Sequence, residues 1–487
     1  MTEPPAESPA PIPGSITTAD RVETRLGTLE FFDGLPTAAT ADLLHDHLTF
    51  IRGVESFLNG VPAASIEGLR RGMVELGAVT SQQCVIFDRL MDSTPLFLTG
   101  NTDTVYASVI LDLMRDGATV VEIPPGCGPG TVNDAWFRFV IDMGAPGPDR
   151  GQGGKYLVLP PDYEGEAPDG YFTVTSPSYT NWLILRGLLV DGRPDPAAAM
   201  FREGLRVYPL AASADPPDME FISGSGRNVN TIHANDSTFY EELHSVIDRE
   251  HLGVIDAETR GLLAGIGIRK GVPFAPDERM AGILRDAAAV GNATARSLFF
   301  RTRDPDAYVY DDGSHWKAGF VGGDYRWLID DGDGGRNLDA RTYFFYVATV
   351  NTPAMALKMV GVGSQYAILD VDRDDAYLDG ARTYRLNIPA DPPAKDFWSV
   401  VAYDPQSRSE LRTGQPYPSK NSAKDQLDKN DDGSVDLYFG PSAPDGHDRN
   451  WIQTVPGKGW FVVLRLYGPL EPWFDHTWRP GELDRID

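Results

Sequence analysis

The feature that most constrains the fold of this chain is a strand-rich stretch near its C-terminus, residues 397–480. It holds an aromatic run before Asp404-Pro405, an alternating polar and apolar segment at 434–439, and an apolar run at 460–464. Asp-Gly and Pro-Gly pairs separate these segments, which is typical of antiparallel strands joined by tight turns. The stretch therefore predicts an antiparallel β-sheet unit at the C-terminal end.

The rest of the chain changes between helical and strand-like patterns. Apolar residues three or four apart at 40–59 predict a helix that Gly60-Val61-Pro62 ends, with Ser65 as the N-cap of a second helix. Strand-like runs broken by Gly, Pro and Asp turns follow at residues 105–113, 119–123, 136–142, 155–159 and 171–175. Helical patterns then dominate between 211 and 300.

These patterns predict a multidomain α+β protein with two antiparallel β-sandwich (jelly-roll-like) domains joined by a helical segment. The expected divisions are a disordered Pro/Ala/Glu-rich tail at 1–35, helices and a β-sandwich at 36–209, a mainly helical insert with an aromatic loop at 210–350, and a second β-sandwich at 351–487.

Charge and composition narrow the classes of partner. The 487 residues carry a formal net charge of −27, which disfavours nucleic acid and anionic membranes as partners. Polyanionic substrates are disfavoured less firmly, because a local basic cleft can override the net field. Cys84 and Cys127 have neither metal-site nor disulfide spacing, so both are expected to be buried free thiols. Without a signal-peptide pattern or a bilayer-length apolar run, a soluble, cytoplasmic protein is expected, and a homodimer is left open.

Two stretches of the sequence resemble known families. The motif LTGNTDTVY at 98–106, followed by Asp112-Leu113 and by 121–124, is similar to the core of domain-of-unknown-function family 1254. The C-terminal stretch resembles family 1214 in its motifs Tyr403-Asp404-Pro405, Asp432-Gly433-Ser434, Asn450-Trp451 and Leu466-Tyr467-Gly468-Pro469. The resemblance implies jelly-roll-like β-sandwich domains with a helical segment between them, and a loose association with polysaccharide-lyase-like activity.

Asn101, Asp103 and Tyr106 share a turn-to-strand junction in the first motif. As functional groups, Asp103 and Tyr106 would face a cleft as acid/base or orienting residues, and Asn101 would contact the substrate. As structural groups, Asn101 and Asp103 would bond the local backbone in an Asx-type turn, and Tyr106 would pack inside the sandwich. The sequence leaves both interpretations open.

Trp136, Arg138 and Arg186 lie in strand-like runs. Arg138 follows Trp136 by two residues, so both are predicted to project from the same face of one strand. An arginine on an otherwise apolar face either pairs with an internal carboxylate or receives an anionic ligand. In so acidic a chain the internal pair is the favoured interpretation.

The aromatic loop and the helix after it supply further candidates. His315 is a candidate general base beside Trp316, a candidate stacking platform for a sugar, although a lone loop histidine is more often a surface or packing residue. Tyr343 and Tyr346 lie on one face of the predicted helix, a spacing that is also typical of core residues.

One acidic segment resembles half of a calcium loop. Asp428, Asn430 and Asp432 have the spacing of the first EF-hand ligands, but the twelfth position is Phe439, not Glu. An Asp-Gly turn explains the same residues. No metal or other cofactor is therefore expected, and calcium is kept as the alternative.

Together these residues predict a cofactor-independent lyase or hydrolase that acts on a small polar or saccharide-like substrate at the interdomain cleft. The expected catalytic residues are His315, Tyr346, Arg138, Asp103 and Tyr106. The expected substrate-binding residues are Asn101, Trp136, Arg186, Trp316 and Tyr343. The alternatives are a non-catalytic carbohydrate- or ligand-binding β-sandwich protein and a structural protein whose acidic surface serves solubility. No G-x-S-x-G, H-E-x-x-H or Walker motif occurs.

Overall fold

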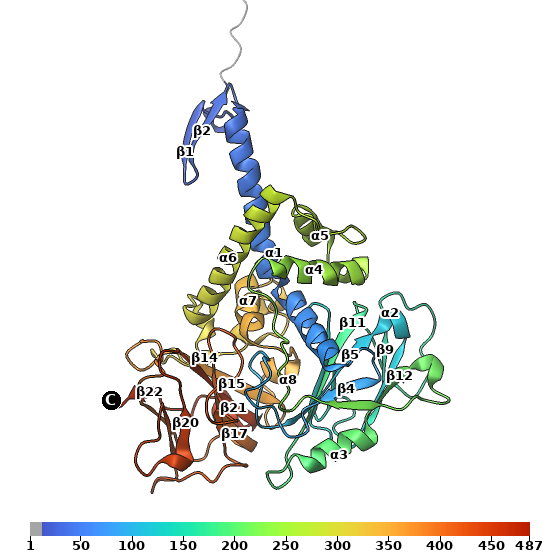
Figure 1. The fold of residues 1–487 in the computed structure, drawn as a ribbon, viewed down its shortest axis with the longest axis vertical. Helices are drawn as coiled ribbons and strands as arrows, with labels where there is room; N and C mark the ends of the chain where they lie inside the picture. The colour runs from blue at the N-terminus through green and yellow to red at the C-terminus, as the bar shows by residue number, and fades with distance from the viewer. Residues whose placement is uncertain (1–11) are drawn as a thin grey trace, which may run out of the picture.

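The computed structural model describes residues 12–487 and shows a mixed α+β protein (Figure 1). The predicted disorder of residues 1–11 lies outside the described residues. The following residues differ from the prediction, because they form a small antiparallel sheet instead of a disordered tail. Its strands are β1 (Arg21–Thr24), β2 (Gly27–Phe32) and β3 (Leu35–Pro36). This sheet and the start of the first helix project from the body of the molecule.

The N-terminal half contains two open sheets. The six-stranded sheet has the order β13-β4-β5-β11-β7-β8, with β4 (Gln83–Ile86), β5 (Val105–Asp112), β7 (Pro129–Asp134), β8 (Phe139–Gly144), β11 (Thr180–Gly187) and β13 (Glu220–Ser223). The four-stranded sheet has the order β10-β9-β6-β12, with β6 (Thr119–Ile123), β9 (Gly154–Leu159), β10 (Phe172–Thr175) and β12 (Arg206–Pro209). Apolar side chains from one face of each sheet share a single core cluster.

The C-terminal half repeats this two-layer plan. One sheet has the order β14-β15-β21-β17-β18, with β14 (Lys317–Ala318), β15 (Ser364–Leu369), β17 (Ala394–Tyr403), β18 (Ser419–Asn421) and β21 (Phe461–Pro469). The other has the order β20-β19-β16-β22, with β16 (Tyr384–Ile388), β19 (Val435–Gly440), β20 (Trp451–Gln453) and β22 (Leu483–Arg485). Every sheet in residues 12–487 is open, and three strand pairs are parallel, so the expected jelly-roll topology is not shown.

The long helix α1 (Ala38–Leu76) corrects the prediction of two helices at 40–59 and from Ser65 onward. Pro62 lies inside it and Ser65 is a buried mid-helix residue, not an N-cap. Proline removes one backbone hydrogen bond from a helix. Here the turns around Pro62 are fully buried against α4 (Thr238–Arg249) and α6 (Glu278–Phe300), so tertiary packing sustains the helix.

The remaining helices are shorter than α1, α4 and α6. They are α2 (Leu113–Asp116), α3 (Asp195–Gly204), α5 (Ala257–Ala264), α7 (Leu338–Val347), α8 (Pro353–Ala356) and α9 (Glu471–Phe474). Side chains of α1, α4, α6 and α7 form one large core with the outer faces of β5, β11, β15, β17 and β21. The helices therefore join the two halves of the molecule.

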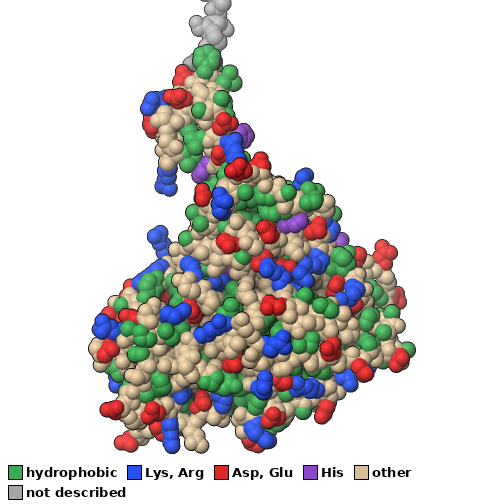
Figure 2. All heavy atoms as spheres, viewed as in Figure 1, with side chains coloured by type: hydrophobic (Ala, Val, Ile, Leu, Met, Phe, Trp, Pro, Cys, Tyr) green, Lys and Arg blue, Asp and Glu red, His purple; other side chains and the backbone are tan. Residues whose placement is uncertain are grey.

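Acidic and basic side chains are interspersed over the face shown in Figure 2, and no region of that face is of one sign alone. Cys84 and Cys127 are buried free thiols, as predicted. In residues 12–487 no helix is long and apolar enough to cross a membrane.

The close packing of α1 on α6 predicts opposite effects on stability for alanine substitutions at two glycines of α6. A Cβ at Gly291 would lie 2.7 Å from Phe57 Cγ, whereas one at Gly282 would meet only the flexible end of Arg285 at 3.8 Å. Overpacking costs about 1–3 kcal/mol, and alanine gains about 1 kcal/mol over glycine in a helix. We expect Gly291→Ala to lower the free energy of unfolding in chemical denaturation and Gly282→Ala to raise it. Equal effects would contradict this account of the helix pair.

Candidate functional site

Strand β21 presents two faces of different chemistry. Val462, Leu464 and Leu466 enter the C-terminal core, while the alternate residues Arg465 and Tyr467 face the other way. Tyr366 on β15 is the register partner of Arg465. The guanidinium carbon of Arg465 lies 5.2 Å from the centre of the Tyr366 ring. The C-terminal half thus contributes a cross-strand arginine–tyrosine pair to the seam between the two halves.

The N-terminal half contributes a matching pair. On β11, Leu183 and Leu185 enter the core of that half, and Arg186 lies on the opposite face. Its register partner on β5 is Tyr106, whose ring centre is 5.8 Å from the guanidinium carbon. Across the seam, Arg186 Nη1 donates a 3.2 Å hydrogen bond to the Tyr366 hydroxyl. Two arginine–tyrosine pairs from sequence-distant strands therefore meet at one place.

The two arginines carry charge that no carboxylate balances directly. Arg186 and Arg465 are only 6% and 4% exposed, and in residues 12–487 neither has a carboxylate oxygen within ion-pair distance. Arg465 Nη2 donates to the carbonyl of Thr99 at 2.6 Å and to the Tyr403 hydroxyl at 2.7 Å, while its Nε is buried without a partner. A buried, unpaired cation is costly, so the site is suited to an anionic ligand.

Asp103, a carboxylate of the seam, is hydrogen-bonded to groups other than the two arginines. It is fully buried and accepts hydrogen bonds from the Ser399 hydroxyl and from Asn421 Nδ2, the latter at 2.9 Å. Both donors belong to the C-terminal half, so Asp103 ties the two halves together. Glu410, also fully buried nearby, has no partner for either carboxylate oxygen, and burial followed by Asp103 raises its pKa well above the ordinary value. This shift favours the neutral form of Glu410.

The arginines change the acidity of Tyr366. Burial alone would raise the pKa of its phenol, but Arg186 and Arg465 together outweigh burial and bring that pKa below the ordinary value of 10.0. In contrast, burial raises the pKa of Tyr106 despite the same two arginines. Tyr366 is therefore the phenol of this cluster best suited to accept a proton.

The cluster encloses a small cavity of about 40 Å³, which we call the seam cavity. Its polar lining includes the two arginine–tyrosine pairs, and Tyr343 and α8 residue Met355 also lie at its wall. The volume suits a group of a few atoms, such as a carboxylate. Two β-branched residues of the wall have left-handed backbone, Thr99 at φ 39° and Val350 at φ 72°. Such strain costs about 1–3 kcal/mol per residue and is concentrated at functional sites.

A wider groove of about 610 Å³, the outer groove, borders the seam cavity. The two share Gly319, Met355 and Tyr366 in their walls. Aromatic rings from separate segments line the groove: Tyr308, Phe320, Tyr366, Trp473, Phe474 and His476. A molecule in the outer groove would therefore contact Tyr366 and rest against aromatic faces.

On its other side Arg186 also lines a smaller hollow that contains Asp142 and Ser364. Burial raises the pKa of Asp142 to about 6, although hydrogen bonds from Thr352 and Thr131 oppose the shift. The Thr352 hydroxyl donates to Asp142 Oδ1 at 2.6 Å, and the Ser364 hydroxyl is buried without a partner. A carboxyl that titrates near neutrality thus lies close to the seam.

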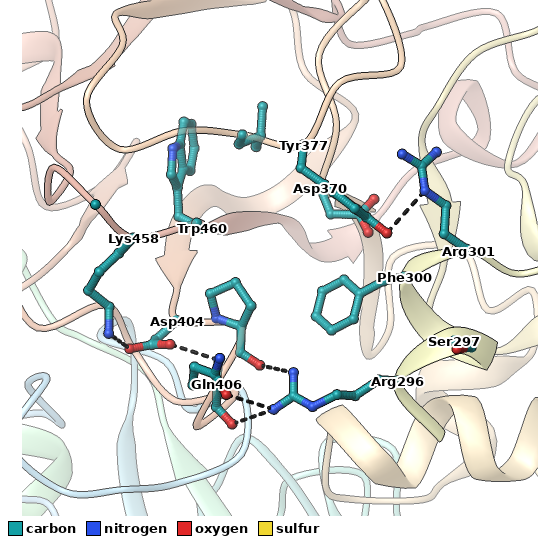
Figure 3. A pocket seen from close by; sticks show the side chains of 14 residues that line it. Arg296, Ser297, Phe300, Arg301, Asp370, Tyr377, Asp404, Gln406, Lys458 and Trp460 are labelled. Atoms are coloured by element: carbon teal, nitrogen blue, oxygen red, sulfur yellow. Dashed lines mark hydrogen bonds and ion pairs between the residues drawn. The ribbon is translucent and has the colours of Figure 1, made fainter. Parts of the chain in front are cut away.

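Another hollow, of about 610 Å³ between α6 and the C-terminal half, is less suited to an anion (Figure 3). Arg296 is directed at the backbone carbonyls of Pro405 and Gln406, to which it donates at 2.9 and 3.1 Å. Lys458 is paired with Asp404. These cations already have oxygen partners, unlike the buried Nε of Arg465.

Asn101 shows features of both interpretations of its motif, because it forms a local turn and also contacts a residue of the seam cavity. Asn101 Oδ1 accepts hydrogen bonds from the backbone of Asp103 at 2.9 Å and of Thr104 at 3.1 Å, which is the expected Asx-type turn. Its Nδ2 donates to the Tyr106 hydroxyl, so the turn also orients a residue of the seam cavity.

Other candidates lie away from the seam cavity. His315 Nδ1 is 3.5 Å from Glu482 Oε2, and Trp316 is buried in the C-terminal core, where its indole donates to the Gly481 carbonyl, so Trp316 presents no open face to a sugar. Tyr346 donates to Asn292 Oδ1 and packs in the helical core, although Tyr343, one turn away, reaches the cavity wall.

Trp136 and Arg138 also lie elsewhere. Trp136 is in the turn between β7 and β8, not in a strand, so the prediction that both project from one strand face is wrong. Arg138 pairs with Asp134, as the favoured interpretation expected. For Arg186 that interpretation is wrong, because its partner at the seam is the Tyr366 phenol.

The acidic segment at 428–436 forms a turn at the start of β19. Gly433 has φ 85°, and Asp432 accepts hydrogen bonds from the backbone and hydroxyl of Ser434, at 2.9 and 2.6 Å. Asn430 donates to Ser434, and Asp428 pairs with Arg449 at 3.1 Å. The turn is not part of a hairpin, since β19 pairs with β16 and β20. Within residues 12–487 no group of three or more His, Cys, Asp and Glu is arranged to hold a metal ion.

Sequence reasoning missed Arg465 and Tyr366, the C-terminal pair of the cavity. A signal for Arg465 was present, because it is the one charged residue in the buried run of β21. A central arginine in such a run must face something other than the apolar core. No comparable signal identifies Tyr366, since tyrosine is ordinary in strands.

The fold and the seam cavity define a two-domain α+β protein with a cationic site between its halves. Residues 82–209 match the family described as Protein of unknown function (DUF1254), and residues 363–471 match Protein of unknown function (DUF1214). The chain therefore contains one region similar to each family, in the order that the sequence motifs indicated. The seam cavity takes one arginine–tyrosine pair from each matched region.

Two solved structures are similar to the chain, and the first of them supports the fold. The crystal structure of the VPA0106 protein from Vibrio parahaemolyticus is 16% identical, covers 90% of this chain and 100% of its own, and has a TM-score of 0.55. An uncharacterized protein from Burkholderia cenocepacia is 12% identical over 92% of this chain and 96% of its own, with a TM-score of 0.41. No curated protein matches the chain.

The pair of arginines predicts an unusually acidic phenol. In an ultraviolet titration of phenolate absorbance, wild-type protein should show one tyrosine that ionises below its ordinary pKa of 10.0. Tyr366→Phe should remove this early component, and Tyr106→Phe should leave it, because the pKa of Tyr106 is raised. An early component that survives in Tyr366→Phe would contradict the assignment.

Asp142 predicts a pH dependence of stability. Its folded-state pKa of about 6 exceeds the ordinary value of 3.8, so the stability that it contributes is present below pH 3.8 and is lost as pH rises through about 6. Asp142→Asn is always neutral and should lack this component in denaturant unfolding measured across that range. The same pH profile in both proteins would show that Asp142 is not protonated when folded.

Proposed function

We propose that the seam cavity binds the carboxylate of a small polar or saccharide-like substrate and that the protein is a lyase acting by β-elimination. The single observation that carries this proposal is the pair of buried arginines, Arg186 and Arg465, beside an acidified Tyr366. The proposed step uses only side chains of this chain.

The charge and the size of the seam cavity determine which group it can bind. A carboxylate in the seam cavity would accept charge-assisted hydrogen bonds from guanidinium groups that lack a carboxylate partner. The small volume admits the carboxylate alone, so the remainder of the substrate would lie in the outer groove against aromatic rings such as Phe320 and Trp473. A ring-bearing carboxylic acid, such as a uronic acid, has both parts.

Chemistry follows from the position of Tyr366 in both spaces. As phenolate, Tyr366 would take the proton from the carbon next to the carboxylate, and the C–H electron pair would form the new C=C bond as the β-substituent leaves. The negative charge that develops on the carboxylate during this step would be stabilised by Arg186 and Arg465. The β-substituent would leave into the outer groove and take a proton from solvent there.

Two other functions use the same site. In a hydrolase, a water molecule would attack in place of proton abstraction. Asp306 and Asp311 line the outer groove, but neither belongs to the wall that the groove shares with the seam cavity. In a non-catalytic binding protein, the arginines and aromatic rings would hold the ligand, and Tyr366 would only donate a hydrogen bond. The acidified phenol favours the lyase.

Binding can be tested with a matched pair of sugars. We expect wild-type protein to bind glucuronate more tightly than glucose in calorimetry, because only the former has a carboxylate. Arg186→Gln should weaken glucuronate binding about 10–100-fold, since a charge-assisted hydrogen bond contributes about 1.5–3 kcal/mol. Arg382→Gln, a change at an exposed arginine that lines neither the seam cavity nor the outer groove, is the control. Equal affinity for both sugars would remove the carboxylate site.

Catalysis needs a separate variant. Tyr366→Phe keeps the ring and both arginines, so it should retain glucuronate binding and lose elimination, measured as the absorbance of unsaturated product from polyuronates. Turnover that persists in Tyr366→Phe would exclude this phenol as the base. Binding by the wild type without any turnover would favour the ligand-binding protein.

A further inference from the structure

A second cationic hollow lies on another face of α7. It has a volume of about 730 Å³, and we call it the arginine cleft. Four arginines line it: Arg138, Arg326, Arg336 and Arg341. They come from the β7–β8 turn, from the loop before α7 and from α7 itself. The cleft shares no wall residue with the seam cavity.

The four arginines are unevenly balanced by carboxylates. Arg138 pairs with Asp134, yet its Nη2 is buried without a partner. Arg326 pairs with Asp324 at 3.2 Å. Arg341 donates to Asn59 Oδ1 at 2.8 Å, its Nε is buried without a partner, and no carboxylate in the described part of the chain lies within ion-pair distance of it.

The excess of positive charge in the cleft is not removed by the contacts of Arg336 or by Asp256, the remaining acidic residue of the wall. Arg336 Nη1 donates to the carbonyl of Arg326, a neutral acceptor. The carboxylate of Asp256 accepts hydrogen bonds from the backbone and the hydroxyl of Thr259, both at 2.8 Å, where it caps α5. It is therefore committed to the end of that helix.

The arginines also act on one another. Burial, then Arg336 and Arg138, lower the pKa of Arg341 to about 10. Burial and Arg138 lower the pKa of Arg336 as well. Such shifts mean that like charges are held close together in a partly dry site. An anion between them would relieve the repulsion and satisfy the unpartnered N–H groups.

The walls of the cleft are aromatic and partly strained. Trp136 and Phe345 are buried in it, and the ring of Phe139 meets that of Tyr325 edge to face at 5.5 Å. Phe137, also in the wall, has left-handed backbone at φ 55°. The volume is in the range of pockets that bind small molecules, about 300–1,000 Å³.

We propose that the arginine cleft binds a multivalent oxyanion, a phosphate or sulfate group carried by a small molecule. Guanidinium forks bind such oxyanions bidentately, and the several arginines suit more than one negative charge. The aromatic walls would hold the uncharged part of the ligand. The chain as a whole has a net charge of −27, so the arginine cleft is a local region of positive charge in an acidic protein.

The proposal is tested by calorimetry on the full chain with pyrophosphate, sulfate and acetate. Wild-type protein should bind pyrophosphate or sulfate more tightly than acetate, and the relative affinities assign the phosphate or sulfate class. Arg341→Met keeps the aliphatic length and removes the charge, so it should weaken oxyanion binding about 10–100-fold. Arg382→Gln should bind as the wild type does, and so should Arg186→Gln, because the seam cavity is separate.

A second measurement separates ligand binding from a structural role. Because Arg341→Met removes a repelling charge, its ligand-free form should unfold at or above the temperature of the wild type, and pyrophosphate should raise that temperature less. A purely structural arginine would show the opposite, a lower unfolding temperature without a change in the ligand-induced shift. That result, or equal pyrophosphate affinity in wild type and Arg341→Met, would overturn the proposal.

Discussion

The burial of two guanidinium groups between facing sheets is the constraint on which the seam depends. Arg186 projects from near the C-terminal end of β11 and Arg465 from the middle of β21, each on the face turned away from the apolar core of its own half. Each is stacked on a tyrosine of the neighbouring strand, and carbonyl and phenol oxygens take up part of their hydrogen bonding. Removing these charges from water is expensive, and phenols repay only part of the cost. The buried seam therefore keeps positive charge that the surrounding side chains only partly balance.

The helical layer makes this arrangement possible. Without α1, α6 and α7 the outer faces of the two sheets would meet directly, and their apolar residues would close the space. The helices instead cover those faces, and α7 with the following segment forms a wall of the seam cavity. Close approach at Gly53 and Gly291 lets α1 and α6 pack tightly enough to hold the two halves in register. A polar seam thus coexists with a large shared core.

Much of the architecture, but only part of the site, could be predicted from the sequence. Turn chemistry and alternation located most strands, and the motif around Asn101 and Tyr106 lies at the seam as one interpretation expected. The length of α1 could not be predicted, because tertiary burial outweighs the effect of Pro62. Alternation also shows that a residue such as Arg465 leaves the core, but not what it meets. That depends on a partner strand from the other half of the chain. His315 looked reactive for its residue type alone, and nothing local showed that Glu482 would be its neighbour.

Because each half supplies one arginine–tyrosine pair, the seam cavity is a joint product of segments from both ends of the chain. During synthesis the N-terminal half can complete its own core long before β21 leaves the ribosome, and until then Arg186 and Tyr106 face solvent or transient neighbours. Docking of the C-terminal half desolvates both guanidinium groups in one event. The site is therefore complete only when the two halves have come together.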